Sequence, residues 1–273
     1  EELENRLLDF EMKGLVPNDP IPVGSKTSEP HRYGMKAWVD LFTPRQLLGH
    51  LTAMEALHDL KAEIISEYGT EKARALITYL QFAIDKIVDY NSRQTRWIAQ
   101  RGTISGTFSR HDFSLKWTFG EMAYAGPSSG MAWGISQVLD AYTGISELAA
   151  ERHKQGLKNG DLIQLRGSGA DMVSLSDQSV DAIVMDPPYY NNVQYSELSD
   201  FYYVWQRRNL ADLYPNWFES AVTDKTSEAV SNPARDGGEK PAKAHYEELM
   251  QGIFAESKRV LKPDGIMTVM FTH

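Results

Sequence analysis

The N-terminal part of the chain carries two stretches in which apolar residues recur at helical spacing. The first, residues 44–68, follows Thr43, with Pro44 at the first helical position and Gln46 three residues past the cap, the pattern of a capping box. Gly69 ends this stretch, and a second one follows with apolar residues at Leu76, Leu80, Ala83, Ile84 and Ile87. The pattern predicts two antiparallel helices joined by a very short turn. Their apolar stripes need a partner surface, which favours a scaffold over the alternative, a platform for target DNA.

The C-terminal part has the pattern of strands alternating with a helix. Residues 182–185 are a short continuous apolar run, as expected of a buried strand in a parallel sheet. Residues 246–261 have the pattern of a helix, 262–265 that of a turn with proline and glycine, and 266–271 that of another apolar strand. Residues 161–165 are a further strand candidate. Strands with a helix between the last two predict an α/β fold built on a doubly wound sheet.

The same patterns predict how the chain is organised. We expect a mainly helical region over residues 1–155 and a sheet-bearing region over residues 156–273. Weak alternation over 113–124 predicts a hairpin, and the polar, glycine- and proline-rich stretch 223–244 predicts a mobile loop. One helical face carries large apolar residues that are expected in the core rather than on a base-stacking surface: Leu198, Phe201, Tyr202 and Trp205.

Composition narrows the class of protein. The chain has 273 residues, 42% of them hydrophobic, which is enough to bury a core. Its 28 basic and 37 acidic residues give a net charge of −9, which argues against non-specific DNA binding unless the basic residues cluster locally. The absence of cysteine excludes disulfides and cysteine-ligated zinc, and no cluster has metal-ligand spacing, so no metal is expected. No apolar stretch has membrane-spanning length and no secretory signal is present, so we expect a cytoplasmic protein.

The strongest chemical signal is the sequence Asp186-Pro187-Pro188-Tyr189-Tyr190, which directly follows the apolar run 182–185. The two prolines stiffen the backbone and supply no N–H, so the segment offers hydrogen-bond acceptors only. In open α/β sheets, ligands bind outside the carboxyl ends of the strands, where Asp186 is expected.

This motif suits methyl transfer to the amino group of a base. An adenine amino nitrogen is a poor nucleophile because its lone pair is delocalised into the ring. Asp186 Oδ and the Pro187 carbonyl can each accept one amino hydrogen, and Tyr189 or Tyr190 can stack on a base that has left the duplex. The alternative is a strand that ends in a proline turn with both tyrosines packed in the core.

Other polar residues add weaker signals. Asn191 and Asn192 follow the motif and His273 follows the last strand, so all three are candidates for lining the pocket, although Asn is also an ordinary loop residue. The remaining histidines occur singly on helical segments and are expected at the surface or as satisfied core residues: His50, His58 and His153.

A mixture of arginine and tryptophan follows the second of the two predicted helices. Arg93, Arg96, Trp97, Arg101 and Arg110 can hold phosphates and stack a base. The same residues also fit a solvated helix end that Trp97 anchors to the core.

Together these segments resemble a family of adenine-specific DNA methylases that is catalogued largely as a domain of unknown function. The resemblance extends over most of the chain and is carried by residues 33–36 with 40–48, 133–139, 186–205 and 259–265. Some members of the family sit in phage-defence gene clusters. The resemblance implies a partial Rossmann-like class I methyltransferase sheet preceded by the mainly helical region.

The resemblance also implies a cofactor, a substrate and a set of site residues. By that resemblance, Asp186, Pro187, Pro188 and Tyr189 form the catalytic motif of an amino methyltransferase that acts on N6 of adenine in DNA. S-adenosylmethionine is the expected methyl donor, and Asp171, with Gly169 just before it, matches the position that contacts the adenine of this cofactor. Defence-system proteins are expected partners, in phage defence or restriction-modification.

The chain departs from the family pattern in one respect. Members carry a glycine-rich loop of the Asp-Pro-Phe-x-Gly-x-Gly kind after their first strand, and this chain has none. The chain also begins at Glu1 and stops at His273, directly after a strand, so we expect an internal piece that lacks the first cofactor-binding strands. Two alternatives stay open: methylation of another acceptor (RNA, cytosine or a protein glutamine), and a non-catalytic piece that binds DNA or a partner protein.

Overall fold

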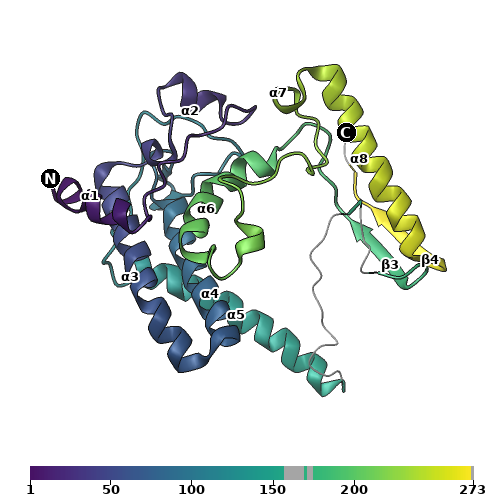
Figure 1. Cartoon of the computed structure of the whole chain (residues 1–273), viewed down its shortest axis with the longest axis horizontal. Helices are drawn as coiled ribbons and strands as arrows, with labels where there is room; N and C mark the ends of the chain where they lie inside the picture. Colours follow the sequence, from purple (N-terminus) through teal and green to yellow (C-terminus); the bar gives the residue numbers. More distant parts are fainter. Residues whose placement is uncertain (157–168, 171–174, 272–273) are drawn as a thin grey trace. The chain divides into compact units, whose positions relative to one another are not determined.

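The computed structural model of the chain describes residues 1–156, 169–170 and 175–271. Figure 1 shows helices joined by long irregular segments. The residues described contain four strands. The helices are α1 (Glu2–Met12), α2 (Ser28–Arg32), α3 (Pro44–Tyr68), α4 (Thr70–Tyr90), α5 (Gly130–Lys154), α6 (Tyr195–Leu210), α7 (Pro233–Asp236) and α8 (Glu239–Val260), with 3-10 turns at Trp38–Leu41 and Pro215–Trp217. The strands are β1 (Arg96–Ile98), β2 (Thr103–Ser105), β3 (Val180–Met185) and β4 (Leu261–Val269). The described residues therefore form a mixed α/β fold with two small sheets and no closed barrel.

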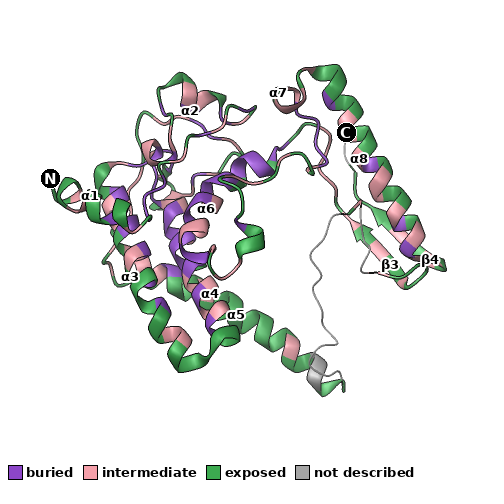
Figure 2. Cartoon of the chain, viewed as in Figure 1, coloured by how far each residue is buried: buried purple, intermediate pink, exposed green. Residues whose placement is uncertain are grey.

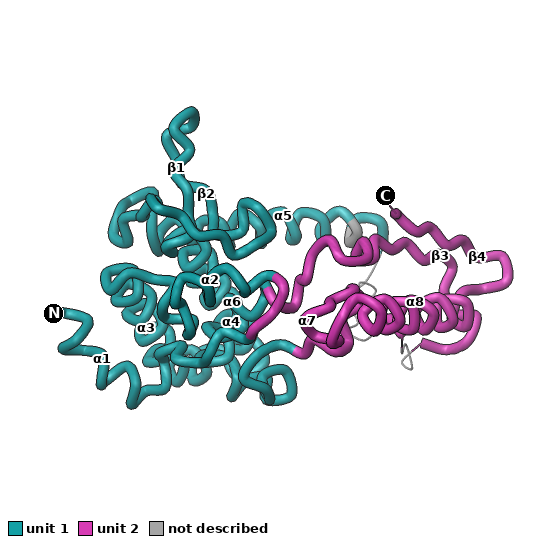
Figure 3. Tube along the Cα trace, turned by 90° about the horizontal axis from the view of Figure 1, so that it is seen from above, with its two compact units in different colours: residues 1–22, 26–158, 198–223 teal, residues 23–25, 159–197, 224–273 magenta. Residues whose placement is uncertain are grey.

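The chain divides into two compact units, coloured in Figure 3. Unit 1 contains residues 1–22, 26–158 and 198–223, and unit 2 contains residues 23–25, 159–197 and 224–273. The division near residue 158 lies close to the boundary expected between 155 and 156. Residues 198–223, however, return to unit 1, because the apolar face of α6 belongs to its core.

The helix pair α3 and α4 agrees with the prediction from the sequence. Thr43 Oγ1 accepts a hydrogen bond from the Gln46 amide at 3.2 Å, and Gln46 Oε1 accepts one from the Thr43 amide at 2.9 Å. Gly69 alone separates the two helices and has φ +73°, which L side chains rarely adopt. The capping box and the glycine stop are therefore confirmed.

The core of unit 1 includes the predicted apolar face of α6. Phe201 and Trp205 are fully buried, and the Phe42 ring lies between them, with centroid distances of 5.8 Å and 5.5 Å. Figure 2 shows buried residues concentrated along α4 and α6. Gly134 allows α5 to approach α4 closely, since a Cβ there would meet the Ala83 carbonyl at 2.6 Å. The prediction that this face of α6 is core rather than a stacking surface is confirmed for both rings.

The hairpin predicted over residues 113–124 is wrong. The hairpin of unit 1 is formed instead by β1 and β2, with Trp97 opposite Ile104. Residues 113–124 contain no strand because distant side chains satisfy their backbone. The Asn91 side chain accepts a hydrogen bond from the Met122 amide at 2.9 Å and donates one to the Met122 carbonyl at 3.1 Å. The Thr95 hydroxyl donates to the Gly120 carbonyl at 2.6 Å.

In unit 2, β3 and β4 form a parallel pair. Ala182 to Met185 pair in register with Ile266 to Val269, while residues 262–265 bulge from β4 opposite Asp181. The predicted turn is therefore retained inside the strand, and the Lys262 ammonium donates to the Asp181 carboxylate at 2.5 Å. Helix α8 begins at Glu239, seven residues before its predicted start, because the first turn of a helix tolerates Pro241.

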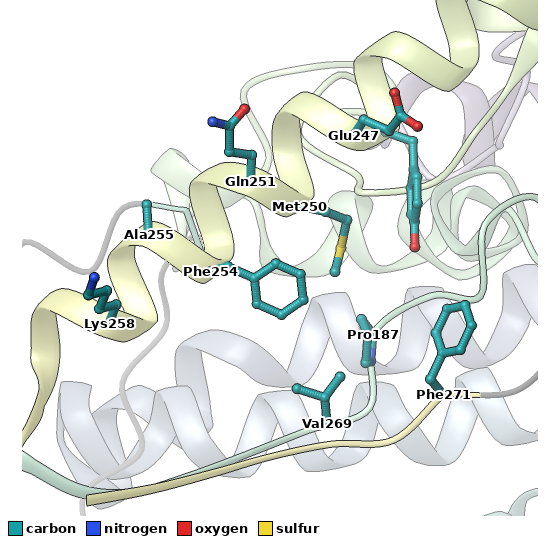
Figure 4. Close-up of a pocket in the computed structure, with 10 residues that line it drawn as sticks. Pro187, Glu247, Met250, Gln251, Phe254, Ala255, Lys258, Val269 and Phe271 are labelled. Atoms are coloured by element: carbon teal, nitrogen blue, oxygen red, sulfur yellow. The ribbon is translucent and has the colours of Figure 1, made fainter. Parts of the chain in front are cut away.

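The expectation that β3 is a buried strand is wrong. Val184 is 70% exposed, and its neighbour Ile266 on β4 is also 70% exposed. Only the opposite face of the pair, which carries Val269, faces α8 among the described residues (Figure 4). The sheet therefore has one covered and one open face in this part of the chain.

The prediction of a mobile loop over 223–244 is wrong as well. This stretch contains α7 and the start of α8, and Val230, Ser231 and Asn232 are at most 1% exposed. Asn232 Oδ1 accepts from the amide of Ala234 at 3.1 Å and so caps α7. The Arg235 guanidinium donates to the backbone carbonyls of Lys225, Glu228 and Val230, so a polar sequence folds by satisfying its own backbone.

Candidate active site

Asp186 lies at the carboxyl end of β3, as the sequence predicts. The Met270 amide, directly after β4, donates to the Met185 carbonyl at 2.9 Å. The backbone hydrogen bonds between the two strands therefore continue up to the residue before Asp186. Asp186 itself is exposed. Because the strands are parallel, Asp186 and Phe271 emerge at the same edge of the sheet.

Tyr189 is bonded directly to the carboxylate. Its hydroxyl donates to Asp186 Oδ1 at 2.6 Å, and this hydrogen bond raises the pKa of Tyr189. The Tyr189 ring lies 6.3 Å from the ring of Phe271, at an interplanar angle of 85°. Tyr189 therefore orients the carboxylate and leaves Oδ2 as its second acceptor.

Two acceptors of the motif remain available. Within the residues that the structure describes, no donor is bonded to Asp186 Oδ2 or to the Pro187 carbonyl. The next carbonyl is used internally: Pro188 accepts from the Tyr190 amide at 3.1 Å and from the Tyr246 hydroxyl at 3.4 Å. The motif thus presents one carboxylate oxygen and one backbone oxygen at the edge of the sheet.

Tyr190 has a structural role. Its φ of +51° lies in the left-handed region, which is unusual for an aromatic residue. Its carbonyl accepts from the Ser231 amide at 2.8 Å, and its ring packs edge-on against Tyr246 with centroids 5.4 Å apart. The Tyr190 ring is therefore held by α8 in this structure, and Tyr189 is the better placed of the two to meet a base.

The loop after the motif is anchored by buried polar side chains. Glu197 is 3% exposed and accepts from the Ser25 amide at 3.2 Å and from Asn232 Nδ2 at 2.7 Å. The Gln194 amide donates to the Asn191 carbonyl at 3.2 Å. These contacts fix the backbone that carries the motif, and they all lie within unit 2.

A pocket of about 620 Å³ adjoins the motif within unit 2. Figure 4 shows Met250 and Phe254 pointing from α8 toward Pro187 and Val269. Phe271 closes the side nearest the motif, and the other lining residues, all on α8, are Tyr246, Glu247, Gln251, Ala255 and Lys258. The walls are mainly apolar and aromatic, as in pockets that accept flat organic ligands.

None of the remaining predicted site residues that the structure describes lines the pocket. Asn191 and Asn192 are exposed and directly follow the motif, but neither lines the pocket. Gly169 is exposed, and a Cβ there would meet the Ile253 side chain of α8 at 3.4 Å. Asp171, His273 and the strand candidate 161–165 lie outside the described residues.

Two aromatic residues near the motif were missed in the sequence. Phe271 directly follows β4 as Asp186 follows β3, and this equivalence at the ends of parallel strands could have identified it. Tyr246 gave no local signal, because its contacts with Pro188 and Tyr190 depend on how α8 packs.

No helix in the described part of the chain is long and apolar enough to cross a membrane. Among the same residues, no group of three His, Asp or Glu side chains could hold a metal ion. Comparison with family models, with curated proteins and with solved structures returned no match for this chain.

Proposed function

We propose that this chain is an S-adenosylmethionine-dependent DNA methyltransferase that transfers a methyl group to N6 of a flipped adenine. The observation that supports this most is the pair of free acceptors, Asp186 Oδ2 and the Pro187 carbonyl, at the carboxyl end of a parallel strand. The resemblance of the motif and its flanking segments to adenine-specific DNA methylases adds to it. A partial Rossmann-like methyltransferase sheet is part of this proposal.

The chain's own residues act on the amino group of the base. Asp186 Oδ2 and the Pro187 carbonyl each accept one of its two hydrogens, so the nitrogen lone pair localises. A methyl donor, when bound, would supply the methyl carbon to which nitrogen bonds as the methyl–sulfur bond breaks, and the methylated nitrogen would then lose a proton to solvent. The Tyr189 hydroxyl holds the carboxylate through Oδ1. Stabilising the charge that develops on nitrogen with fixed acceptors is the kind of preorganisation that accelerates such steps.

The described residues do not by themselves fit the methyl donor. The pocket next to the motif is walled mainly by apolar side chains, and Gly169 is exposed without a polar partner for the cofactor in the described chain. The choice of S-adenosylmethionine as methyl donor therefore rests on the resemblance.

The proposal is tested by incubating the chain with tritiated S-adenosylmethionine and duplex DNA. We expect label in the DNA, recovered as N6-methyladenine after digestion to nucleosides. Asp186→Ala should reduce it by about 100-fold or more, since it removes a preorganised acceptor. Asp181→Ala, on the same strand but paired with Lys262, is the matched control and should retain activity.

Other outcomes contradict the proposal in distinct ways. Label only in RNA, only in cytosine or only in protein would reassign the acceptor. No label in any acceptor, together with no binding of the cofactor in calorimetry, would identify the chain as non-catalytic.

A further inference from the structure

The β1–β2 hairpin carries a surface that the proposed reaction does not use. We define the hairpin surface as Arg96, Trp97, Arg101, Arg110, Lys116 and Trp117, all in unit 1. Figure 3 shows the hairpin projecting from the rest of unit 1. This position leaves the side chains of its strands and turn open to a large partner.

The hairpin surface is basic in an acidic protein. Residues 90–120 contain five basic residues and one acidic residue, whereas the whole chain has 28 and 37. Of the five, Arg93 is used internally, because its guanidinium donates to the Asp40 carbonyl at 3.0 Å. Arg96, Arg101 and Arg110 are exposed, and none of them has an ion-pair partner among the described residues.

These cations lie close together. Burial is the main cause that lowers the pKa of Lys116. Among the charges near it, Asp112 and Glu29 raise this pKa, while Arg110 and Arg96 lower it. The chain after Lys116 is tied to the base of the hairpin, since Thr95 donates to the Gly120 carbonyl at 2.6 Å. Arg96, Arg110 and Lys116 are therefore neighbours, and Arg101 lies in the turn of the same hairpin, where its amide donates to the Ile98 carbonyl at 3.1 Å.

Two tryptophans of the hairpin surface are exposed. Trp97 is 57% exposed and Trp117 is 89% exposed, so the alternative in which Trp97 anchors the segment to the core is wrong. Trp97 also borders a pocket of about 260 Å³ that Tyr90 and Trp133 line from the other side. Exposed aromatic rings among unpaired arginines are the arrangement that single-stranded nucleic acid requires.

We propose that the hairpin surface binds DNA, with phosphates on Arg96, Arg101 and Arg110 and an unpaired base stacked on Trp97. The inference goes beyond the proposed function, since it concerns a separate surface in unit 1. Only the choice of DNA over RNA rests on that function. The net charge of the chain is no obstacle, because phosphate binding depends on the local cluster.

The test is fluorescence anisotropy with a labelled single-stranded oligonucleotide and the duplex of the same sequence, without S-adenosylmethionine. The triple variant R96A/R101A/R110A should lose at least about tenfold in affinity. Its plot of log affinity against log salt should be shallower by about 2, as expected for three lost phosphate contacts. The control R32A/K72A/K154A removes the same charge from other exposed positions of unit 1 and should bind like the unmodified chain.

Tryptophan variants test the stacking. Trp97→Ala should weaken single-strand binding by about tenfold, and Trp97→Phe should restore most of it, because a phenyl ring still stacks. Equal affinities for the two triple variants, or no binding by the unmodified chain, would overturn the proposal. The proposal would also be overturned if heparin competed for the surface as well as DNA does and Trp97→Ala left the affinity for the oligonucleotide unchanged. The surface would then be a non-specific binding site for anions.

The result is separable from that of the methylation assay. Asp181→Ala should bind the oligonucleotide as the unmodified chain does, because Asp181 belongs neither to the hairpin surface nor to the acceptors proposed for the base. DNA binding through the hairpin surface without methyl transfer would contradict the proposed function alone. Methyl transfer together with unchanged DNA binding by the hairpin-surface variants would contradict this inference alone.

Discussion

At the scale of single residues, burial shifts the pKa values of two side chains of unit 1 in opposite directions. His50 is fully buried, donates to the Asn91 carbonyl at 2.9 Å and accepts from the Tyr124 hydroxyl. Desolvation lowers its pKa to about 3. Desolvation also raises the pKa of Asp85 to about 7, although the Gln206 and Gln81 amides donate to its carboxylate. His50 is thus a satisfied core residue, as the sequence suggests.

The two groups predict opposite dependences of stability on pH. Asp85 stabilises the fold fully below its unfolded pKa of 3.8 and loses this contribution as the pH rises through about 7. His50 stabilises it above 6.5 and loses this contribution as the pH falls toward 3. Between about pH 4 and 6.5 the two slopes oppose each other. Each contribution amounts at most to roughly 5 kcal/mol, at about 1.4 kcal/mol per pKa unit.

Urea unfolding from pH 4 to pH 8 separates these terms. Asp85→Asn should lose stability more steeply on acidification than the unmodified protein does, because only the histidine term remains. His50→Gln should become more stable on acidification from pH 7. The exposed His58→Gln is the control and should keep the original profile, and parallel profiles for all four proteins would contradict the assignment.

At the scale of elements, α3 depends on its capping box. Thr43→Ala should destabilise the protein by about 1 kcal/mol, because the Gln46 amide loses its acceptor. Thermal unfolding measured by circular dichroism checks this. Thr143→Ala, on the exposed face of α5 and away from any helix end, is the matched control and should be neutral or slightly stabilising, so equal losses would rule out the cap.

Elements were predictable where their signals are local. The bounds of α3 follow from Thr43, Gln46 and Gly69, which are neighbours in sequence. The β1–β2 hairpin was not predicted, and residues 113–124 were mistaken for one, because Asn91 and Thr95 satisfy that backbone from far along the chain. The acceptors of the candidate site follow from Asp186 and Pro187 alone. The rings around them depend on the packing of α8, which no short sequence pattern encodes.

At the scale of the whole molecule, unit 1 depends on a segment that follows the motif at residues 186–190. Phe201 is fully buried, as are Val204 and Trp205 of the same helix, and these α6 residues complete a core built mainly from the first part of the chain. Removal of the Phe201 ring should therefore affect α3 and α4, which lie more than a hundred residues earlier. This dependence is why a single boundary near residue 155 describes the chain incompletely.

Phe201→Ala should lower the free energy of unfolding of unit 1 by about 3–5 kcal/mol, the usual cost of truncating a buried phenyl ring. Urea unfolding with detection by circular dichroism measures it, since the helices of unit 1 dominate the signal. Tyr195→Ala truncates a ring of the same helix that is 56% exposed, and it should change stability little. Equal effects of the two changes would place Phe201 outside the core.

The burial of the tryptophans also determines the intrinsic fluorescence of this protein. Trp38 and Trp205 are almost completely shielded from water, so their emission should be blue-shifted and should report the integrity of unit 1. Trp97 and Trp117 are hydrated, so their emission should lie at longer wavelength and be open to quenching by a stacked base. Because Trp217 is also 51% exposed, quenching at long wavelength reports occupation of the hairpin surface only where Trp97→Ala abolishes it, whereas a red shift of the emission of the buried tryptophans reports loss of the core.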